Sequence, residues 1–186
     1  MKIKSTSSGF VTNVNIGRNA FFITLDEDGV EVLEKELFNG AMNFNYVVIR
    51  NIYKDAVQSV NSLIKKLLSS SPKTRIEVNV GCKFLPPNAG SYERVLYNAY
   101  IGNEIEHDKK VIKWLKDASS NFIFNLSKET DLDYINTFAR KHEIDKSKVI
   151  LILRDVDDEL LYMVKLTGYN VSLDVGGILN DSMGGD

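Results

Sequence analysis

The sequence predicts an α/β protein with a mainly parallel, five-stranded sheet, or a partial (half) barrel of the TIM type, preceded by an N-terminal antiparallel β hairpin region. Two observations predict this class. Short apolar runs alternate with amphipathic stretches from residue 41 onward, and the first forty residues follow the period of strands. A chain of 186 residues, 44% of them apolar, can bury one ordinary core. We therefore expect a single domain over residues 1–186, with antiparallel β structure at 1–40, β/α repeats at 41–179 and a flexible tail at 180–186.

The antiparallel region is predicted from two local patterns. Apolar and polar residues alternate over residues 10–16, which is typical of a half-buried strand. Asp28 and Gly29 separate the β-rich runs 21–25 and 30–33, and an Asp-Gly pair in this position predicts a tight turn. We expect the two runs to pair with each other as a hairpin.

After a break at Asn39-Gly40 the period changes to that of β/α units. The predicted strands are residues 46–50, 75–80, 121–126, 149–153 and 170–175. The predicted helices cover about 54–70, 107–118 and 157–168, and one more begins near Thr130. Strands that alternate with helices predict a parallel sheet, because a helical crossover brings the next strand in with the same direction.

Charge and composition exclude several classes of function. The 23 basic and 25 acidic side chains leave a net charge of −2, so we expect no nucleic acid partner. No apolar run approaches the roughly 20 residues of a membrane span, and the first nine residues lack the apolar core of a signal peptide. We expect a cytoplasmic protein without membrane contact. Cys82 is the only cysteine, which rules out an all-cysteine cluster site within one chain.

Several segments, taken in order, are similar to those of a known superfamily. Residues 17–25 (GRNAFFITL) are similar to a first strand of the form G-R-x-A-x-F-x-x-L, and residues 76–81 (IEVNVG) to a strand I-E-x-x-T-N-G. Residues 149–153 and 168–173 are similar to the closing strands. This order resembles the radical S-adenosylmethionine superfamily, and within it the 7-carboxy-7-deazaguanine synthase branch. The resemblance covers most of residues 9–179 and implies a shortened, open barrel.

The departures from that superfamily bear on the chemistry. Its members need three cysteines in a C-x3-C-x2-C loop after the first strand, because three thiolates hold the iron–sulfur cluster. Residues 26–32 stand at that place and contain no sulfur. The Gly-Gly-Glu segment that contacts the cofactor should follow Ile49, where this chain has Arg50-Asn51-Ile52-Tyr53. The resemblance therefore implies a degenerate relative, without cluster and without cofactor.

Residues just after each predicted strand form the candidate ligand site, since ligands of parallel folds bind beyond the carboxyl ends of the strands. These residues are Arg50, Asn51, Asn79, Cys82, Asn125, Arg154 and Asp174. The two arginines could clamp a carboxylate or a phosphate. The alternative is that polar residues at these positions only mark where solvated loops begin.

A segment rich in proline and tyrosine is the candidate interaction surface. Its members are Pro86, Pro87, Tyr92, Tyr97 and Tyr100. Tyrosines on a proline-fixed backbone bury area at small entropic cost, which suits protein contacts. The alternative is that Tyr97 and Tyr100 cover the core of the sheet.

Two further patterns contain residue types that occur in metal sites or catalytic sites. The acidic run 26–28 could offer oxygens to Mg²⁺ or Ca²⁺, but the spacing of a calcium loop is absent and carboxylates in a turn usually face water. Cys82 would need a neighbouring base to act as a nucleophile, and neither His107 nor His142 has a recognisable spacing to it. We predict no catalytic residue and no metal ligand.

Three hypotheses of function follow. The first is a non-catalytic pseudoenzyme that acts as an interaction or structural module, with a protein partner or a second copy of the chain. A shortened barrel without cluster ligands would fit a virus-encoded protein of a larger assembly. The alternative is a cluster-free protein or enzyme that binds a nucleotide-like, purine-like or carboxylate ligand at the carboxyl ends of the strands. The third is a radical enzyme that borrows cluster ligands from another subunit. Fold alone does not select among them.

Overall fold

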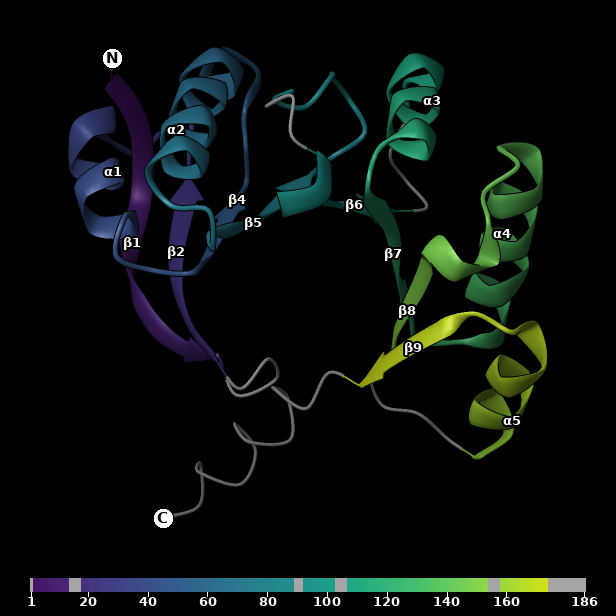
Figure 1. Ribbon diagram of the computed structural model, residues 1–186. Helices are drawn as coiled ribbons and strands as arrows, with labels where there is room; N and C mark the ends of the chain where they lie inside the picture. Colours follow the sequence, from purple (N-terminus) through teal and green to yellow (C-terminus); the bar gives the residue numbers. More distant parts are fainter. Residues whose placement is uncertain (1, 14–17, 89–91, 103–106, 154–157, 174–186) are drawn as a thin grey trace. The chain divides into compact units, whose positions relative to one another are not determined.

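The computed structural model describes residues 2–13, 18–88, 92–102, 107–153 and 158–173 (Figure 1). The chain forms two compact units. Unit 1 consists of Met1–Ala99 and Glu106–Ser120, and unit 2 of Tyr100–Ile105 and Asn121–Asp186. The predicted tail at 180–186 lies outside the described residues.

Unit 1 is built on a mixed sheet with the strand order β3-β1-β2-β4-β5-β6. Its strands are β1 (Lys2–Asn13), β2 (Arg18–Leu25), β3 (Val30–Leu33), β4 (Tyr46–Arg50), β5 (Arg75–Val80) and β6 (Val95–Ile101). Its helices are α1 (Glu34–Ala41), α2 (Val57–Ser70) and α3 (Lys109–Asp117), with short 3₁₀ turns η1 (Lys54–Ala56) and η2 (Tyr92–Arg94). The strands β2, β4, β5 and β6 are parallel and lie in chain order. Right-handed connections in this order place the helices on one face, and Figure 1 shows α2 and α3 on the same side of β4, β5 and β6.

Unit 2 repeats the β/α pattern on a smaller scale. It contains the parallel strands β7 (Ser120–Leu126), β8 (Val149–Leu153) and β9 (Asn170–Leu173), in that order. Its helices are α4 (Glu129–Lys141) and α5 (Asp158–Thr167), and the turn η3 (Lys146–Lys148) leads into β8. Helix α4 begins where the Asp131 carboxylate accepts hydrogen bonds from the backbone N–H groups of Ser127 and Lys128. Helix α5 ends at Gly168, whose φ of +74° gives the left-handed cap that the sequence predicts.

The prediction of an α/β protein with a mainly parallel sheet is confirmed, but the number of strands is wrong. Seven strands run parallel to a neighbour, four in unit 1 and three in unit 2. The prediction missed β6, because no helix separates it from β5 and the alternation of strands with helices therefore did not indicate it. It also assigned β2 to the antiparallel region, although β2 is parallel to β4.

The predicted hairpin between residues 21–25 and 30–33 is also wrong. The strands β2 and β3 do not pair with each other; β1 lies between them and is antiparallel to both. Helix α1 then follows β3 directly and includes Gly40, which the sequence indicated as part of a break. Glycine fits at this position because the Phe21 ring packs closely against it: an added Cβ atom would lie 2.6 Å from that ring.

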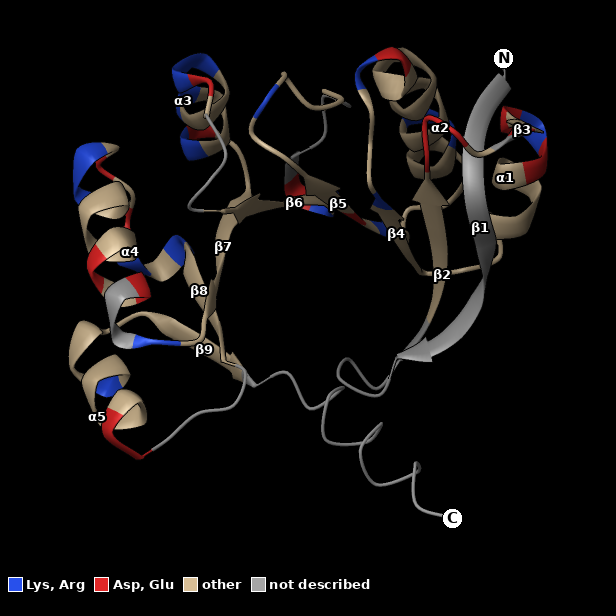
Figure 2. Ribbon diagram, turned by 180° about the vertical axis from the view of Figure 1, so that it is seen from behind, with Lys and Arg blue, Asp and Glu red and all other residues tan. Residues whose placement is uncertain are grey.

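The helix-side face of the unit 1 sheet is the apolar core. One row across its four parallel strands is formed by Ile23, Ile49, Val78 and Tyr97, each at most 1% exposed. The Tyr97 ring meets Trp114 of α3 edge-on at 5.0 Å between centroids. Charged residues lie mainly on the helices and at the ends of strands, as Figure 2 shows. Among the described residues, no helix combines the length and the apolar composition needed to cross a membrane.

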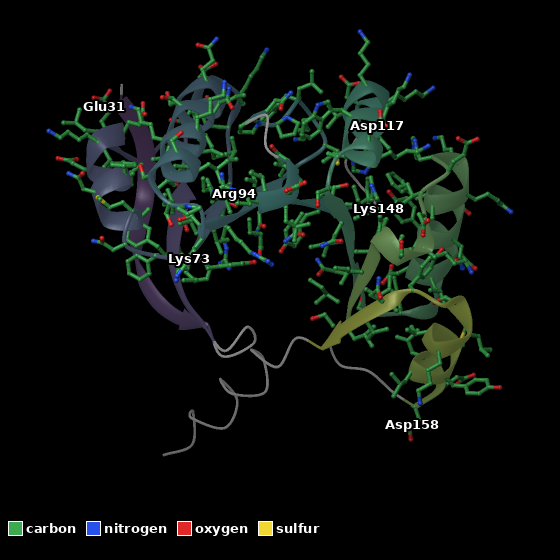
Figure 3. All side chains as sticks on the ribbon, viewed as in Figure 1. Glu31, Lys73, Arg94, Asp117, Lys148 and Asp158 are labelled. Carbon is green, nitrogen blue, oxygen red and sulfur yellow. The ribbon has the colours of Figure 1, made fainter. Side chains whose placement is uncertain are left out.

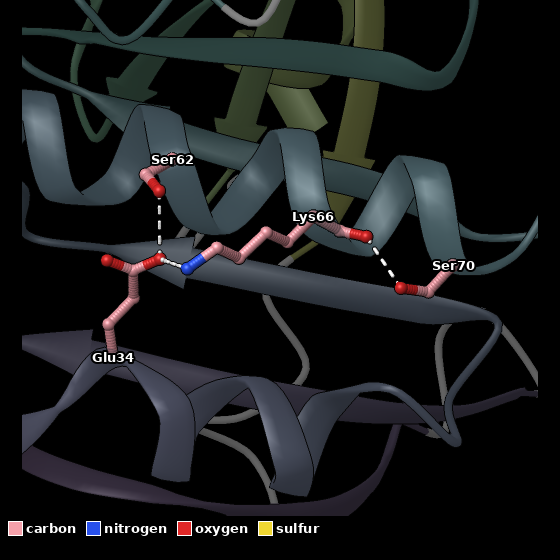
Figure 4. Close-up of polar contacts among 4 residues, drawn as sticks. All are labelled: Glu34, Ser62, Lys66 and Ser70. Atoms are coloured by element: carbon pink, nitrogen blue, oxygen red, sulfur yellow. Dashed lines mark hydrogen bonds and ion pairs between the residues drawn. The ribbon is translucent and has the colours of Figure 1, made fainter.

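Two polar contacts fix α2. At its carboxyl end, the Arg94 guanidinium, labelled in Figure 3, donates hydrogen bonds to the carbonyl oxygens of Leu68 and Ser71, at 3.1 and 2.8 Å for the closest pairs. At its middle, Ser62 and Lys66 donate to the Glu34 carboxylate of α1, at 2.9 and 2.6 Å (Figure 4). Because Glu34 is 4% exposed, this contact joins the two helices through a buried charge.

Candidate functional site

The opposite face of the unit 1 sheet carries a row of polar side chains, which we call the polar row. It consists of Thr24, Arg50, Asn79 and Asn98, one residue from each of β2, β4, β5 and β6. Thr24 pairs in register with Arg50, and Asn79 with Asn98. Arg50 and Asn79 are also neighbours on adjacent strands, because they directly follow Ile49 and Val78, which pair in register. Since side chains alternate along a strand, the polar row lies on the face away from the helices.

A second row on this face is also partly polar. It contains Phe22, Val48, Glu77 and Leu96, which are paired in register. Tyr46 of β4 donates a hydrogen bond to the Glu77 carboxylate at 2.7 Å. Parallel strands that are covered by apolar layers on both faces are almost continuously hydrophobic. The unit 1 strands depart from that pattern on one face only, which points to polar contacts there.

Arg50 is held in place without using its hydrogen-bonding groups. Its guanidinium carbon lies 4.4 Å from the centroid of the Phe22 ring, a cation–π contact. The side chain is exposed, and no residue that the structure describes forms an ion pair with it. Its N–H groups are therefore available to a carboxylate or a phosphate, which guanidinium groups bind in bidentate geometry.

Asn79 has an unsatisfied acceptor. Its Oδ1 atom is buried and has no hydrogen-bond partner among the described residues. A buried polar atom without a partner costs about 1–3 kcal/mol, so such atoms usually have a role. A ligand that donates an N–H or O–H group to Oδ1 would recover this energy.

Asn51, the residue after Arg50, has a left-handed backbone with φ of +55°. It stands at the carboxyl end of β4 and not at the end of a helix, where this conformation is common. Asparagine tolerates left-handed geometry better than most residues, yet the conformation still carries strain. Of the predicted ligand residues, the register of β4 with β5 places Arg50 beside Asn79, and Asn51 is the next residue in the chain after Arg50.

The other predicted ligand residues lie elsewhere. Cys82 follows β5 but is 1% exposed, and burial alone raises the pKa of its thiol to about 12. Asn125 is exposed at the end of β7 in unit 2. Arg154 and Asp174 lie outside the described residues. Thr24 and Asn98 were missed, because they fall within strands and only the register between strands reveals that they share a row with Arg50.

The predicted interaction surface is largely interior. Tyr97 is 1% exposed, and its hydroxyl donates a hydrogen bond to the Pro87 carbonyl at 2.6 Å. Pro86 and Pro87 are buried as well, whereas Tyr100 is 41% exposed. The side chain of Tyr92 lies outside the described residues. The alternative was that Tyr97 and Tyr100 both cover the core of the sheet; Tyr97 is buried there, whereas Tyr100 is exposed.

The residues do not fit an iron–sulfur cluster. The chain has one cysteine, and the acidic run 26–28 forms a turn in which Asp26 accepts a hydrogen bond from the backbone N–H of Asp28 at 3.0 Å. Over the described part of the chain, no three residues of the types His, Cys, Asp and Glu group together to hold a metal ion. His142 packs against the Phe138 ring in unit 2, and Cys82 owes its high pKa to burial alone, so neither residue indicates a thiolate–imidazole pair.

Unit 2 has a depression of about 540 Å³ beside α4 that the sequence did not predict. Asn136, Arg140, Lys146 and Tyr169 are among the residues that line it. Two of its polar side chains have partners, since Tyr169 donates to Asn136 at 2.9 Å and Lys146 donates to the Thr167 carbonyl at 2.7 Å.

Comparison with known protein families and with curated proteins finds no match to this chain. We therefore infer function from the geometry of the polar row and from the chemistry of its residues.

Proposed function

We propose that the chain is a non-catalytic binding protein, a cluster-free relative of the radical S-adenosylmethionine fold, that binds a small anionic molecule at the polar row of unit 1. The observation that carries the proposal is the buried Oδ1 atom of Asn79, which has no hydrogen-bond partner among the described residues, next in register to Arg50, whose guanidinium stacks on the Phe22 ring and forms no ion pair within the described part of the chain. An acceptor and a cation side by side fit a ligand that has both an N–H donor and a carboxylate or phosphate.

Two features of the fold support this proposal. Within each unit the parallel strands lie side by side in the order in which they occur in the chain, as in a singly wound β/α protein. If such a sheet curves into a partial barrel, the barrel encloses the face that carries the polar row. In addition, Arg50 and Asn51 stand at the carboxyl end of β4, the end at which parallel β/α folds bind their ligands.

The chemistry of the site favours binding over catalysis. Acid–base or nucleophilic catalysis needs a group that gains or loses a proton near neutral pH or a reactive nucleophile. The polar row consists of a threonine, an arginine and two asparagines, so it contains no carboxylate, imidazole or thiol, and Cys82 stays protonated because burial raises the pKa of its thiol to about 12. Recognition of the ligand through charge and hydrogen bonds is what these residues can perform.

A thermal-shift screen against nucleotides, pterins and S-adenosylmethionine tests the proposal. A ligand at 100 times its Kd stabilises the folded state by about 2.7 kcal/mol, which corresponds to a rise in Tm of roughly 5 to 10 °C for a protein of this size. We expect at least one anionic compound with an N–H donor to produce such a shift. Asn79→Ala and Arg50→Ala should abolish it.

Arg75→Ala is the matched control. Arg75 is an exposed arginine on the same strand as Asn79 and on the same face, but four residues away, which is about 13 Å along the strand. The control should keep the full shift. A shift that survives in Asn79→Ala and Arg50→Ala would place the ligand elsewhere and contradict the proposal.

The interaction module remains a second candidate, and one observation favours it. Helix α5 exposes Tyr162 and Leu166 by 64% and 70%, the largest fractions among the exposed large apolar residues of the described chain. A contact surface for protein is therefore better sought on α5 than on the buried segment around Tyr97.

A further inference from the structure

The polar face of the unit 1 sheet carries a negative charge as well as the positive charge of Arg50. Glu77 of β5 lies on this face, two residues before Asn79. It pairs in register with Val48, and Arg50 follows Val48 by two residues on β4. Glu77 and Arg50 are therefore diagonal neighbours on adjacent strands, at a spacing of about 7 to 8 Å that long side chains can bridge.

The two charges nevertheless do not pair with each other. The Arg50 guanidinium lies over the Phe22 ring of β2, 4.4 Å from its centroid, and the Glu77 carboxylate accepts a hydrogen bond from Tyr46 at 2.7 Å. Among the described residues, neither charged group takes part in an ion pair. Two opposite charges that share one face of a sheet and stay apart are placed to bind the two ends of a ligand that carries both charges.

Asn79 adds an acceptor next to both charged residues. Its buried Oδ1 atom has no hydrogen-bond partner in the described part of the chain. The residue lies beside Arg50 across the strands and next to Glu77 on the same face of β5. A protonated amine has three N–H donors, so one amine can donate to Oδ1 and to the Glu77 carboxylate at once. An uncharged N–H group would satisfy Oδ1 but would leave Glu77 without a counter-charge.

The spacing of the strands limits the distance between the two charges of the ligand. The Phe22 ring, over which the guanidinium lies, belongs to β2 and Glu77 to β5, with β4 between them. Two strand spacings are about 10 Å. Charge-assisted hydrogen bonds of about 2.8 Å at both ends leave about 4 Å for the ligand itself. An α-amino acid, whose amine and carboxylate are attached to the same carbon atom, fits this span, whereas a long ω-amino acid does not.

We propose that the ligand of the polar row is an α-amino acid, whose carboxylate binds Arg50 and whose ammonium group binds Glu77 and the Oδ1 atom of Asn79. The inference rests on the ligand site proposed above and adds Glu77 to it as the residue that selects a charged amine. Val48 and Leu96 flank Glu77 in register on the neighbouring strands, so an apolar side chain of the amino acid suits this site better than a charged one.

Isothermal titration calorimetry of the full chain with L-leucine, L-methionine and L-phenylalanine tests the inference. We expect at least one of the three to bind. Its deaminated counterpart, such as 4-methylpentanoate for leucine, should bind at least about tenfold more weakly, because it leaves Glu77 and Asn79 without a donor. Glu77→Gln should weaken binding of the amino acid by a similar factor and remove most of the difference between the two compounds.

Glu93→Gln is the matched control. Glu93 is an exposed glutamate of unit 1 in the turn η2, at the amino end of β6, and its substitution should change neither affinity. Circular dichroism checks that each variant is folded. A fold defect alone would weaken both compounds alike, whereas loss of the preference for the amine reports on Glu77 itself.

The outcomes separate this inference from the proposed function. The amino acid assignment is overturned if none of the three amino acids binds, or if Glu77→Gln keeps the full preference for the amine. The proposed site survives that result when another anion binds and needs both Arg50 and Asn79. An amino acid that still binds to Arg50→Ala and to Asn79→Ala lies elsewhere on the chain, and that result overturns the site and the inference together.

Discussion

The Lys66 ammonium lies 2.6 Å from the Glu34 carboxylate and joins α2 to α1 across unit 1 (Figure 4). Burial of Glu34 on its own would raise the pKa of its carboxyl. The hydrogen bonds from Lys66 and Ser62 and the lysine charge outweigh that effect, and they hold the pKa below its ordinary value of 4.5. A buried carboxylate is thus kept ionised by two donors from one neighbouring helix.

The first prediction concerns Glu34→Gln. The substitution keeps the size of the side chain but removes the charge, and it should lower the free energy of unfolding by about 1 to 2 kcal/mol at pH 7. Urea unfolding followed by circular dichroism measures the difference. Lys35→Met is the control, because Lys35 is an exposed lysine of α1 outside the contact of Glu34 with Ser62 and Lys66, and it should change stability by less than about 0.5 kcal/mol.

The same pair predicts a dependence on pH. A carboxyl whose pKa is lower in the folded state than in the unfolded state stabilises the fold at pH values above the unfolded pKa, and this stabilisation is lost as the pH falls through the folded pKa. The free energy of unfolding of the wild type should exceed that of Glu34→Gln by its full amount above about pH 5, and this difference should shrink below the ordinary pKa of 4.5. An advantage that stays constant down to pH 3 would show that the ion pair contributes nothing.

The second prediction concerns Gly40 in α1. Alanine is the better helix former by about 1 kcal/mol, but its Cβ atom would lie 2.6 Å from the ring of Phe21, which is 8% exposed and packed against Phe44. Gly40→Ala should therefore lower stability by about 1 to 2 kcal/mol instead of raising it. Gly81→Ala is the control, because nothing lies within 4 Å of its added Cβ atom, and thermal unfolding should show no loss there.

The third prediction concerns Cys82. Its thiol is 1% exposed and has a pKa of about 12, so very little thiolate is present at pH 8. Reaction with a thiol reagent such as Ellman's reagent should be at least about 100-fold slower in the folded protein than in denaturant. Rapid labelling of the folded protein at pH 8 would contradict the placement of Cys82 in the core and reopen a nucleophilic role for it.

The sequence predicted the elements whose own periodicity is strong. The strands β4 and β5 and the helix α2 were predicted to within a few residues, because their apolar residues repeat with a clear period and their ends carry polar residues. The helix α1 was missed because Gly40 is normally a break signal. The Phe21 ring leaves no room for a side chain at position 40, a contact between residues nineteen positions apart that no local pattern reveals.

The candidate site was predicted in part for a similar reason. Arg50, Asn51 and Asn79 stand at or near the ends of predicted strands, so their positions alone suggested them. Thr24 and Asn98 became visible only from the register of β2 with β4 and of β5 with β6, which is a property of the folded sheet. The resemblance to the radical S-adenosylmethionine superfamily stays a prediction, as does the curvature of the sheet into a partial barrel.

Native mass spectrometry of protein purified without oxygen tests the central claim most directly, since it reports iron and bound small molecules in one spectrum. We predict a chain that carries a small, metal-free anionic molecule, and we predict that Asn79→Ala loses this molecule while Arg75→Ala retains it. A chain that carries iron and sulfide in stoichiometric amounts would contradict the account, as would a bound molecule that Asn79→Ala retains.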